Sequence, residues 1–126
     1  MTATLPKCAR LLTPRDFRRV YGRGRRLTGK QVVVVALPRR EGSHRLGVSV
    51  SKDHGGAVRR NKLKRILREA FRLERARLPA AFDVVLIPKT PGARLALAEL
   101  RAELLALFER LARGEGRARS EPRPQR

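Results

Sequence analysis

One segment of this chain constrains the fold more than any other, because it reads as a helix with two opposed faces. Residues 55–72 run Gly-Gly-Ala-Val-Arg-Arg-Asn-Lys-Leu-Lys-Arg-Ile-Leu-Arg-Glu-Ala-Phe-Arg. At helical pitch the apolar residues form one stripe, which consists of Leu63, Ile66, Leu67, Ala70 and Phe71. The opposite side carries polar residues one turn apart: Asn61, Arg65, Arg68 and Arg72. The segment therefore predicts a helix that packs on a core and exposes a basic face.

The charge of this helix is too one-sided for a helix that only needs to be soluble. Between Val58 and Arg77 the chain has nine Lys or Arg residues and two Glu residues. Like charges one turn apart repel each other and oppose helix formation. A polyanion along the basic face would relieve that repulsion, and the N–H groups at the start of the helix would add donors for phosphate.

Composition favours the same class of partner. The 126 residues include 31 Lys or Arg and 11 Asp or Glu, for a net charge of +20. Nucleic acid is the leading partner for such a chain, and an anionic membrane surface is second. We expect no membrane partner, because no apolar run reaches the length of a bilayer and the N-terminus lacks a signal peptide. Cys8 is the single cysteine, which suits a reducing cytoplasm.

The net charge is concentrated in two separate segments. Residues 1–30 have nine Lys or Arg and one Asp, and residues 58–77 form the basic helix. If the fold brings the two segments together, they make one basic surface.

The remaining elements follow from local patterns. A first helix should begin with Thr13 as N-cap, Pro14 at N1 and Asp16 closing a capping box, and should end at Gly22 and Gly24. The basic helix should end near Leu78, because Pro79 follows. A last helix should run from Arg94 to near Gly114 on an apolar stripe of Leu97, Leu100, Leu104, Leu107, Phe108 and Leu111.

Between the helices, four segments read as strands. A short strand is expected near Arg25–Thr28. Gln31–Leu37 is almost continuously apolar and reads as a central strand, and Arg45–Val50 alternates like a half-buried one. We expect these last two to pair as an antiparallel hairpin. Phe82–Ile87 is a second buried strand.

This order of elements predicts an α+β fold, with a small mixed sheet packed with three helices. Residues 1–113 should form a single domain. Residues 114–126 are rich in Gly, Pro and Arg without periodicity, so we expect a basic disordered tail.

Catalysis by the chain's own side chains is poorly supported. His44 and His54 are isolated, with no Cys, Asp or Glu at metal-ligand spacing, and Cys8 has no base partner. We therefore expect no catalytic residue and no metal site. Phe17 and Tyr21 share a helix face among arginines. They fit a core, and Tyr21 fits equally well a platform for unpaired bases.

The segment Ala57-Val58-x-Arg60-Asn61-x-x-Lys64-Arg65-x-x-Arg68-Glu69 resembles the signature of the bacterial ribonuclease P protein subunit. Arg60, Asn61 and Arg65 form its core. Further matches run in order from about Arg10 to Leu111: Arg10-Leu11, Asp16-Phe17, Val20-Tyr21-x-x-Gly24, Arg45-x-Gly47-Val48-Ser49-Val50-Ser51-Lys52 and the strand Asp83–Ile87.

The resemblance implies a fold like domain 2 of ribosomal protein S5, with a rare left-handed βαβ crossover that carries the basic helix. It implies a ribonuclease P endoribonuclease whose active centre and Mg²⁺ belong to a catalytic RNA subunit. The protein would hold that RNA and the 5′ leader of precursor tRNA, assisting cleavage that leaves the mature 5′ end. It would act as a monomer in a 1:1 ribonucleoprotein.

Site residues carry over by position. The residues expected to bind the RNA subunit all lie on the basic helix: Arg59, Arg60, Asn61, Lys62, Lys64, Arg65, Arg68 and Arg72. Those expected to bind the leader are Phe17, Tyr21 and Lys52. Three departures from the family pattern matter, and one is the Gly/Arg tail, which lies outside the pattern and is expected to make at most non-specific contact. Val33 and Val35 stand where aromatic residues are frequent, and Asp53 stands where a second basic residue is common.

Three other functions compete with this interpretation. A structural or ribosomal RNA-binding protein would share the fold but would need no cleft for a leader. A DNA-binding regulator would need a neighbouring helix at turn spacing, whereas strands flank this helix. A metabolic enzyme lacks a catalytic constellation.

Overall fold

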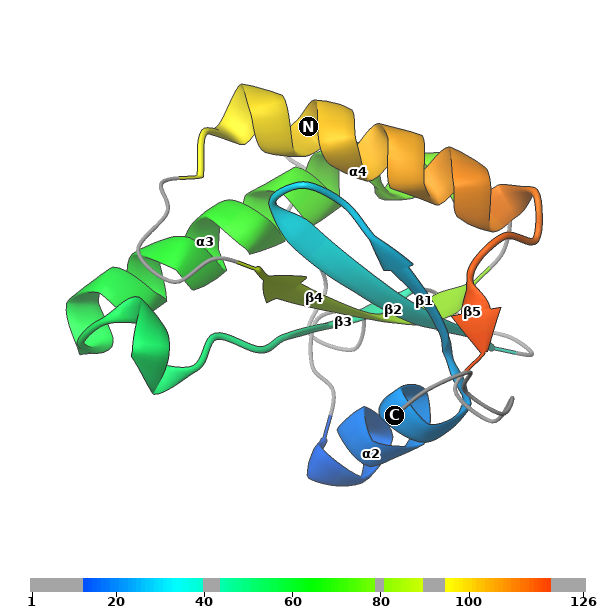
Figure 1. Ribbon diagram of the computed structural model, residues 1–126, viewed down its shortest axis with the longest axis horizontal. Helices are drawn as coiled ribbons and strands as arrows, with labels where there is room; N and C mark the ends of the chain where they lie inside the picture. The colour runs from blue at the N-terminus through cyan, green and yellow to red at the C-terminus, as the bar shows by residue number, and fades with distance from the viewer. Residues whose placement is uncertain (1–12, 40–43, 79–80, 90–94, 119–126) are drawn as a thin grey trace.

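The protein folds as one twisted sheet with helices on both faces (Figure 1). The computed structural model describes residues 13–39, 44–78, 81–89 and 95–118. In Figure 1, helices α3 and α4 lie above the sheet and helix α2 lies below it. The α+β class predicted from the sequence is confirmed.

The elements follow the predicted order. The α-helices are α2 (Pro14–Arg23), α3 (Ala57–Glu74) and α4 (Leu97–Ala112). Two 3₁₀ turns, η1 (Lys52–His54) and η2 (Arg75–Arg77), precede and follow α3. The strands are β1 (Arg25–Thr28), β2 (Val32–Pro38), β3 (Arg45–Val48), β4 (Phe82–Pro88) and β5 (Arg117–Ala118).

The start of α2 confirms the predicted capping box. The backbone N–H of Asp16 donates to the Thr13 hydroxyl at 3.1 Å, and the Asp16 carboxylate accepts from the Thr13 backbone N–H at 3.1 Å. At the other end, Gly24 caps the helix. A Cβ on Gly24 would lie 2.9 Å from the carbonyl oxygen of Ala36 on β2. Only glycine therefore lets the end of α2 approach the sheet this closely.

The predicted hairpin between residues 31–37 and 45–50 is wrong. The strand order is β3-β4-β2-β1-β5, so β4 lies between β2 and β3. Strand β2 pairs antiparallel with β1 and with β4, and β3 pairs parallel with β4. Strand β4 is buried along nearly its whole length, as is typical of a strand inside a covered sheet, whereas β3 is short with half-buried ends, as is typical of an edge strand. The parallel β3–α3–β4 unit is present, and its left-handed crossover stays a prediction.

The tail also differs from its prediction in its first residues. The backbone of Arg117–Ala118 forms β5, which pairs antiparallel with β1 at the edge of the sheet. Glycines with positive φ at Gly114 and Gly116 turn the chain back toward the sheet. The rest of the predicted tail, residues 119–126, lies outside the described residues.

Two hydrophobic cores form, one on each face of the sheet. Alternate residues of β2 separate them, because successive side chains of a strand point to opposite faces. Val32, Val34 and Ala36 join the larger core under α3 and α4, and Val33 and Val35 join the smaller core under α2. The helices of the two basic segments, α2 and α3, therefore lie on opposite faces of the sheet.

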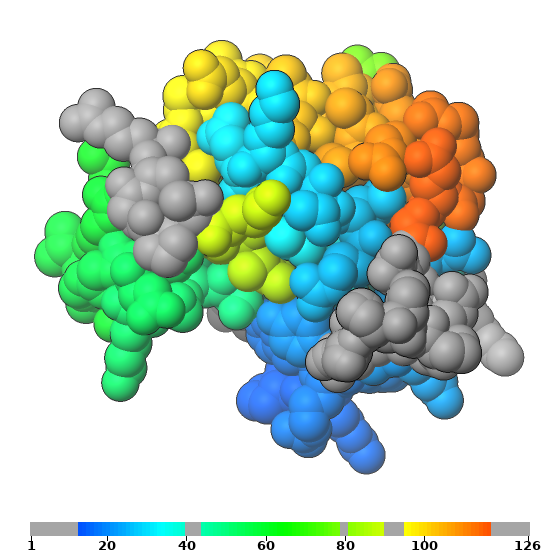
Figure 2. Space-filling view, viewed as in Figure 1, coloured from blue at the N-terminus to red at the C-terminus, as the bar shows by residue number. Residues whose placement is uncertain are grey.

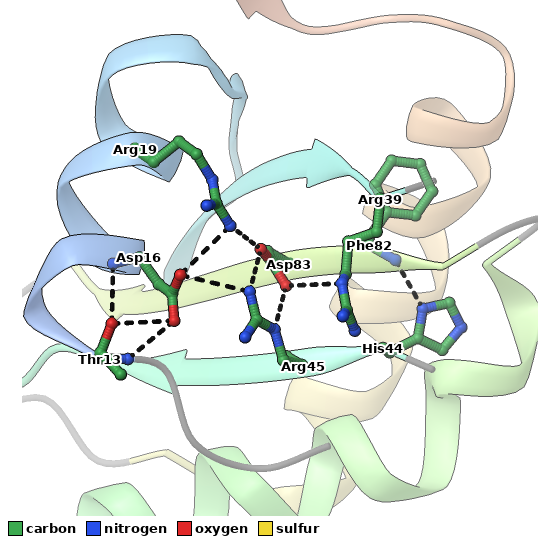
Figure 3. A network of polar contacts seen from close by, with 8 residues as sticks. All are labelled: Thr13, Asp16, Arg19, Arg39, His44, Arg45, Phe82 and Asp83. Atoms are coloured by element: carbon green, nitrogen blue, oxygen red, sulfur yellow. Dashed lines mark hydrogen bonds and ion pairs between the residues drawn. The ribbon is translucent and has the colours of Figure 1, made fainter. Parts of the chain in front are cut away.

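A buried carboxylate ties α2 to three strands (Figure 3). Asp83 on β4 is 0% exposed. Arg45 of β3 donates to it from Nε at 2.8 Å and from a terminal nitrogen at 2.9 Å, and Arg19 of α2 donates at 2.9 Å. Arg39, just after β2, lies 3.5 Å from the same carboxylate. Asp16 extends the network through ion pairs of 3.3 and 3.4 Å to Arg19 and Arg45.

The network keeps both carboxylates charged. Burial alone would raise the pKa of Asp83, but the hydrogen bonds from Arg45 and Arg19 outweigh burial and hold that pKa below its usual value. Burial opposes ionisation of Asp16 in the same way, and the hydrogen bonds from Thr13 with the charges of Arg45 and Arg19 lower its pKa. A charge this deeply buried is tolerated only when it is paired and hydrogen-bonded.

We predict that Asp83→Ala lowers the free energy of unfolding by about 3–5 kcal/mol, because it leaves partly buried guanidinium groups without their counter-charge. Urea unfolding at pH 7 measures this. The contribution of Asp83 should be complete above its unfolded-state pKa, near 3.8, and should be lost as the pH falls through the lower folded-state pKa.

Asp53 provides the matched control. It is an exposed aspartate on η1, so Asp53→Ala should change the unfolding free energy by less than about 0.5 kcal/mol. Equal effects of the two substitutions would contradict a structural role for the network.

Candidate RNA interface

The outer face of α3 is the most basic helix surface in the described part of the chain. Asn61, Lys62, Arg65 and Arg68 are exposed, and Lys64 is half-buried. None of these five side chains has a hydrogen bond or ion pair with another described residue. Their opposite face is anchored, since Leu67, Ala70 and Phe71 are 0% exposed. The helix thus presents unpaired cations on a rigid support.

The first turn of α3 adds backbone donors to this surface. Gly56 is the N-cap without a side-chain cap, and the first turn contains no acidic residue. Arg60 is half-buried and donates from Nε to the carbonyl oxygen of Gly55 at 3.2 Å. A helix N-terminus of this kind favours an anion through its partial positive charge and free N–H groups.

Two members of the predicted RNA-binding set are engaged within the protein. Arg72 is half-buried and donates to Glu69 from Nε at 3.0 Å, with a second, shorter contact between the same side chains. Arg59 is half-buried and also has an interaction within the chain. The unpaired part of the face is therefore narrower than the spacing alone suggests, and it centres on Asn61, Arg65 and Arg68.

The aromatic pair lies on the other face of the sheet. The rings of Phe17 and Tyr21 on α2 are 6.1 Å apart, with 38° between their planes. Both are half-buried and pack against the smaller core, which includes Val33 and Val35. The two valines are 9% and 2% exposed. They support the aromatic rings from below and leave little surface of their own for stacking with a base.

Lys52 lies at the end of the sheet away from the Asp83 network. The parallel register pairs Val48 with Leu86, so β3 and β4 end together, and Val33 of β2 pairs with Ile87 at that end. Lys52 follows β3 there and is exposed on η1. The Asp83 network lies at the opposite ends of these strands. At helical pitch Val20 lies between the side of α2 that carries Phe17 and Tyr21 and the side that carries Arg19 and Arg23.

The two predicted RNA sites are thus separate surfaces. Figure 2 shows α2 (blue) and α3 (green) as separate areas of one face of the molecule. A single RNA strand along α3 would not reach the aromatic pair of α2 without crossing the edge of the sheet.

Both histidines are packed within the protein, His44 half-buried and His54 buried. His44 accepts a hydrogen bond at Nδ1 from the backbone N–H of Phe82 at 3.0 Å, and burial, with Arg75 and Arg39 nearby, lowers its pKa. His54 is 5% exposed. Among the described residues no group of three or more His, Cys, Asp or Glu gathers that could hold a metal ion. No helix in the described ranges is long and apolar enough to span a membrane.

Sequence reasoning missed the arginines around Asp83. Arg19 and Arg45 read as ordinary basic residues in a chain with many of them. The available signal was Asp83 itself, a single carboxylate inside the apolar strand Phe82–Ile87. Such a residue needs a buried cationic partner, but the sequence does not say which arginine supplies it.

Comparison with known proteins agrees with this architecture. A family model described as Ribonuclease P matches residues 5–112. The ribonuclease P protein component of Exiguobacterium sibiricum is 38% identical over 102 residues, covering 80% of this chain and 88% of the relative. That of Desulfovibrio desulfuricans is 42% identical over 113 residues, covering 86% and 87%.

Solved structures give the same result. The RNase P protein from Thermotoga maritima superposes with a TM-score of 0.71 at 36% identity, covering 85% of this chain and 98% of that one. The RNase P protein from Staphylococcus aureus gives a TM-score of 0.69 at 34% identity, covering 84% and 96%. The family model spans most of the chain, and the relatives are more than 30% identical to it along most of their length. This chain therefore belongs to the ribonuclease P protein family.

Proposed function

We propose that this protein binds the catalytic RNA subunit of ribonuclease P through α3 and the 5′ leader of precursor tRNA beside α2. In this role it assists endonucleolytic removal of the leader, and the RNA subunit carries out the chemistry. The observation that carries the proposal is the row of unpaired polar and cationic side chains on α3, centred on Asn61, Arg65 and Arg68. Membership of the ribonuclease P protein family supplies the identity of the RNA.

The binding energy at α3 is electrostatic. Each phosphate that a lysine or arginine neutralises releases condensed counterions, so affinity falls steeply as salt rises. Because α3 packs on the core, its cations are held on a rigid helix, and binding requires little rearrangement of the protein. Arginine also matches phosphate geometry with two parallel N–H donors.

Catalysis is assigned to the RNA partner. Following the family resemblance, we assign the Mg²⁺ ions to the RNA subunit. This chain's own residues bind and orient: α3 holds the RNA subunit, and the flank of α2 holds the strand that leads into the cleavage site. One protein would serve one RNA subunit in the cytoplasm.

The leader would lie against the aromatic flank of α2. Phe17 and Tyr21 present half-buried rings, and unpaired bases stack on such rings with little sequence preference. Lys52, which is exposed on η1, would contact a phosphate of that strand. With Val33 and Val35 in place of aromatics, most of the stacking falls to Tyr21 and Phe17.

We predict that Arg65→Ala and Arg68→Ala each weaken binding to the RNA subunit and leave the fold intact. Both side chains are exposed and unpaired, so their loss removes a phosphate contact and little else. The slope of log affinity against log salt should fall by about 0.7–0.9 for each lost contact. A titration of labelled RNA subunit at several salt concentrations measures both effects.

Arg113→Ala is the control for that titration. Arg113 is an exposed arginine at the end of α4 that pairs with Glu115, and its substitution changes the net charge equally. If Arg113→Ala weakens binding as much as Arg65→Ala, the RNA subunit does not dock on α3.

We predict that Tyr21→Ala chiefly weakens binding of precursor tRNA with a long leader, because it removes a stacking surface worth about 1–3 kcal/mol per base. Tyr21→Phe keeps the ring and should keep the affinity. The measurement is the dissociation constant of the assembled holoenzyme for precursors with and without a leader. An equal loss for a leaderless tRNA would show that Tyr21 does not bind the leader.

A further inference from the structure

An arginine-lined pocket lies on the flank of α2 that faces away from Phe17 and Tyr21. It has a volume of about 470 Å³ and opens to solvent. Four arginines line it: Arg19, Arg23, Arg39 and Arg45. Leu37 and Pro38 form an apolar wall, and Asp83 lies at the base. Neither RNA site described above uses this pocket.

The carboxylates near the pocket are already occupied. Both oxygens of Asp83 accept from arginines, and Asp16 is shared between Thr13, Arg19 and Arg45. Each guanidinium has five N–H donors in a fixed plane. The contacts of Arg19 and Arg45 to Asp83 and Asp16 use only some of these donors, so both arginines can still donate to a further anion.

The arginines are also held in place and partly removed from water. The side chains of Arg19, Arg39 and Arg45 are 40%, 26% and 22% exposed. An ion pair with the buried Asp83 fixes the direction of each guanidinium, which lowers the entropy cost of binding another anion. Partial desolvation strengthens the attraction to that anion.

We propose that this pocket binds a phosphate group of an RNA strand, with the adjoining ribose or base against Leu37 and Pro38. Planar guanidinium groups bind phosphate oxygens with paired hydrogen bonds, and the volume is sufficient for one nucleotide. The RNA identity rests on the proposed function, whereas binding of the anion itself does not.

Arg23 distinguishes a phosphate site from a purely structural clamp. It is the pocket arginine that has no hydrogen bond or ion pair with any described residue, and it is exposed at the end of α2. The clamp between α2 and the strands is complete without it. Removing Arg23 therefore weakens phosphate binding and leaves the clamp intact.

The test is a titration of the full chain with inorganic phosphate, in which NMR monitors the signals of the arginine Nε–Hε groups. We expect saturable shifts of the signals of Arg19, Arg39 and Arg45. Arg23→Ala should raise the dissociation constant roughly tenfold, as expected for loss of one charge-assisted hydrogen bond. Arg18→Ala removes an equal charge from an exposed position on the outer side of the same helix, and it should leave the constant unchanged.

Two results of this titration would overturn the proposal. One is equal weakening by Arg23→Ala and Arg18→Ala, which would mean general attraction to a basic protein. The other is phosphate-induced shifts confined to the arginines of α3.

A second measurement identifies the source of the phosphate. Arg23→Ala and Arg18→Ala are compared in titrations of the protein with the RNA subunit, and of the assembled holoenzyme with precursor tRNA. A selective loss with Arg23→Ala in the first titration assigns the phosphate to the RNA subunit, and in the second to the precursor. No selective loss in either overturns RNA as the ligand. If the unmodified protein does not bind the RNA subunit at all, the proposed function fails, while the phosphate titration still reports on the pocket.

Discussion

The interaction on which the rest of this structure depends is the carboxylate of Asp83 among its arginines. A fully buried charge near the start of a strand would be prohibitively costly alone. Arg45 and Arg19 bring β3 and α2 to it, and Arg39 brings the end of β2 close. This single side chain therefore fixes where α2 crosses the sheet. The position of α2 in turn sets the aromatic flank on one side and the arginine-lined pocket on the other.

The sheet separates the two proposed RNA-binding surfaces, one on each of its faces. The larger core anchors α3, whose outer side holds unpaired cations, and the smaller core anchors α2 with Phe17 and Tyr21. The sheet between the two helices fixes their separation. In the proposed function, the protein would hold a large RNA on one side and position a flexible strand on the other.

Local sequence patterns correctly predicted the features that depend on residues close together in the chain. The capping box of α2 and the apolar stripe of α3 depend on residues a few positions apart, and both were confirmed. Strand partners depend on the whole sheet, so the apolar pattern of residues 31–37 indicated burial without revealing that β4 is the neighbour. The same limit applies to Asp83, whose need for a cation is visible in sequence but whose partners are not. The basic face of α3 was predicted by periodicity, and only the structure revealed that Arg72 is engaged by Glu69.

In the proposed function, this protein assists an RNA catalyst. The most direct measurement is cleavage of precursor tRNA by the ribonuclease P RNA subunit at low Mg²⁺, with and without the purified protein. We expect the protein to increase the rate of leader removal, and we expect this gain to be lost at high salt as phosphate contacts weaken. A structural or ribosomal RNA-binding protein would bind RNA without this gain. Cleavage that is unchanged by saturating protein at low Mg²⁺ would contradict the claim.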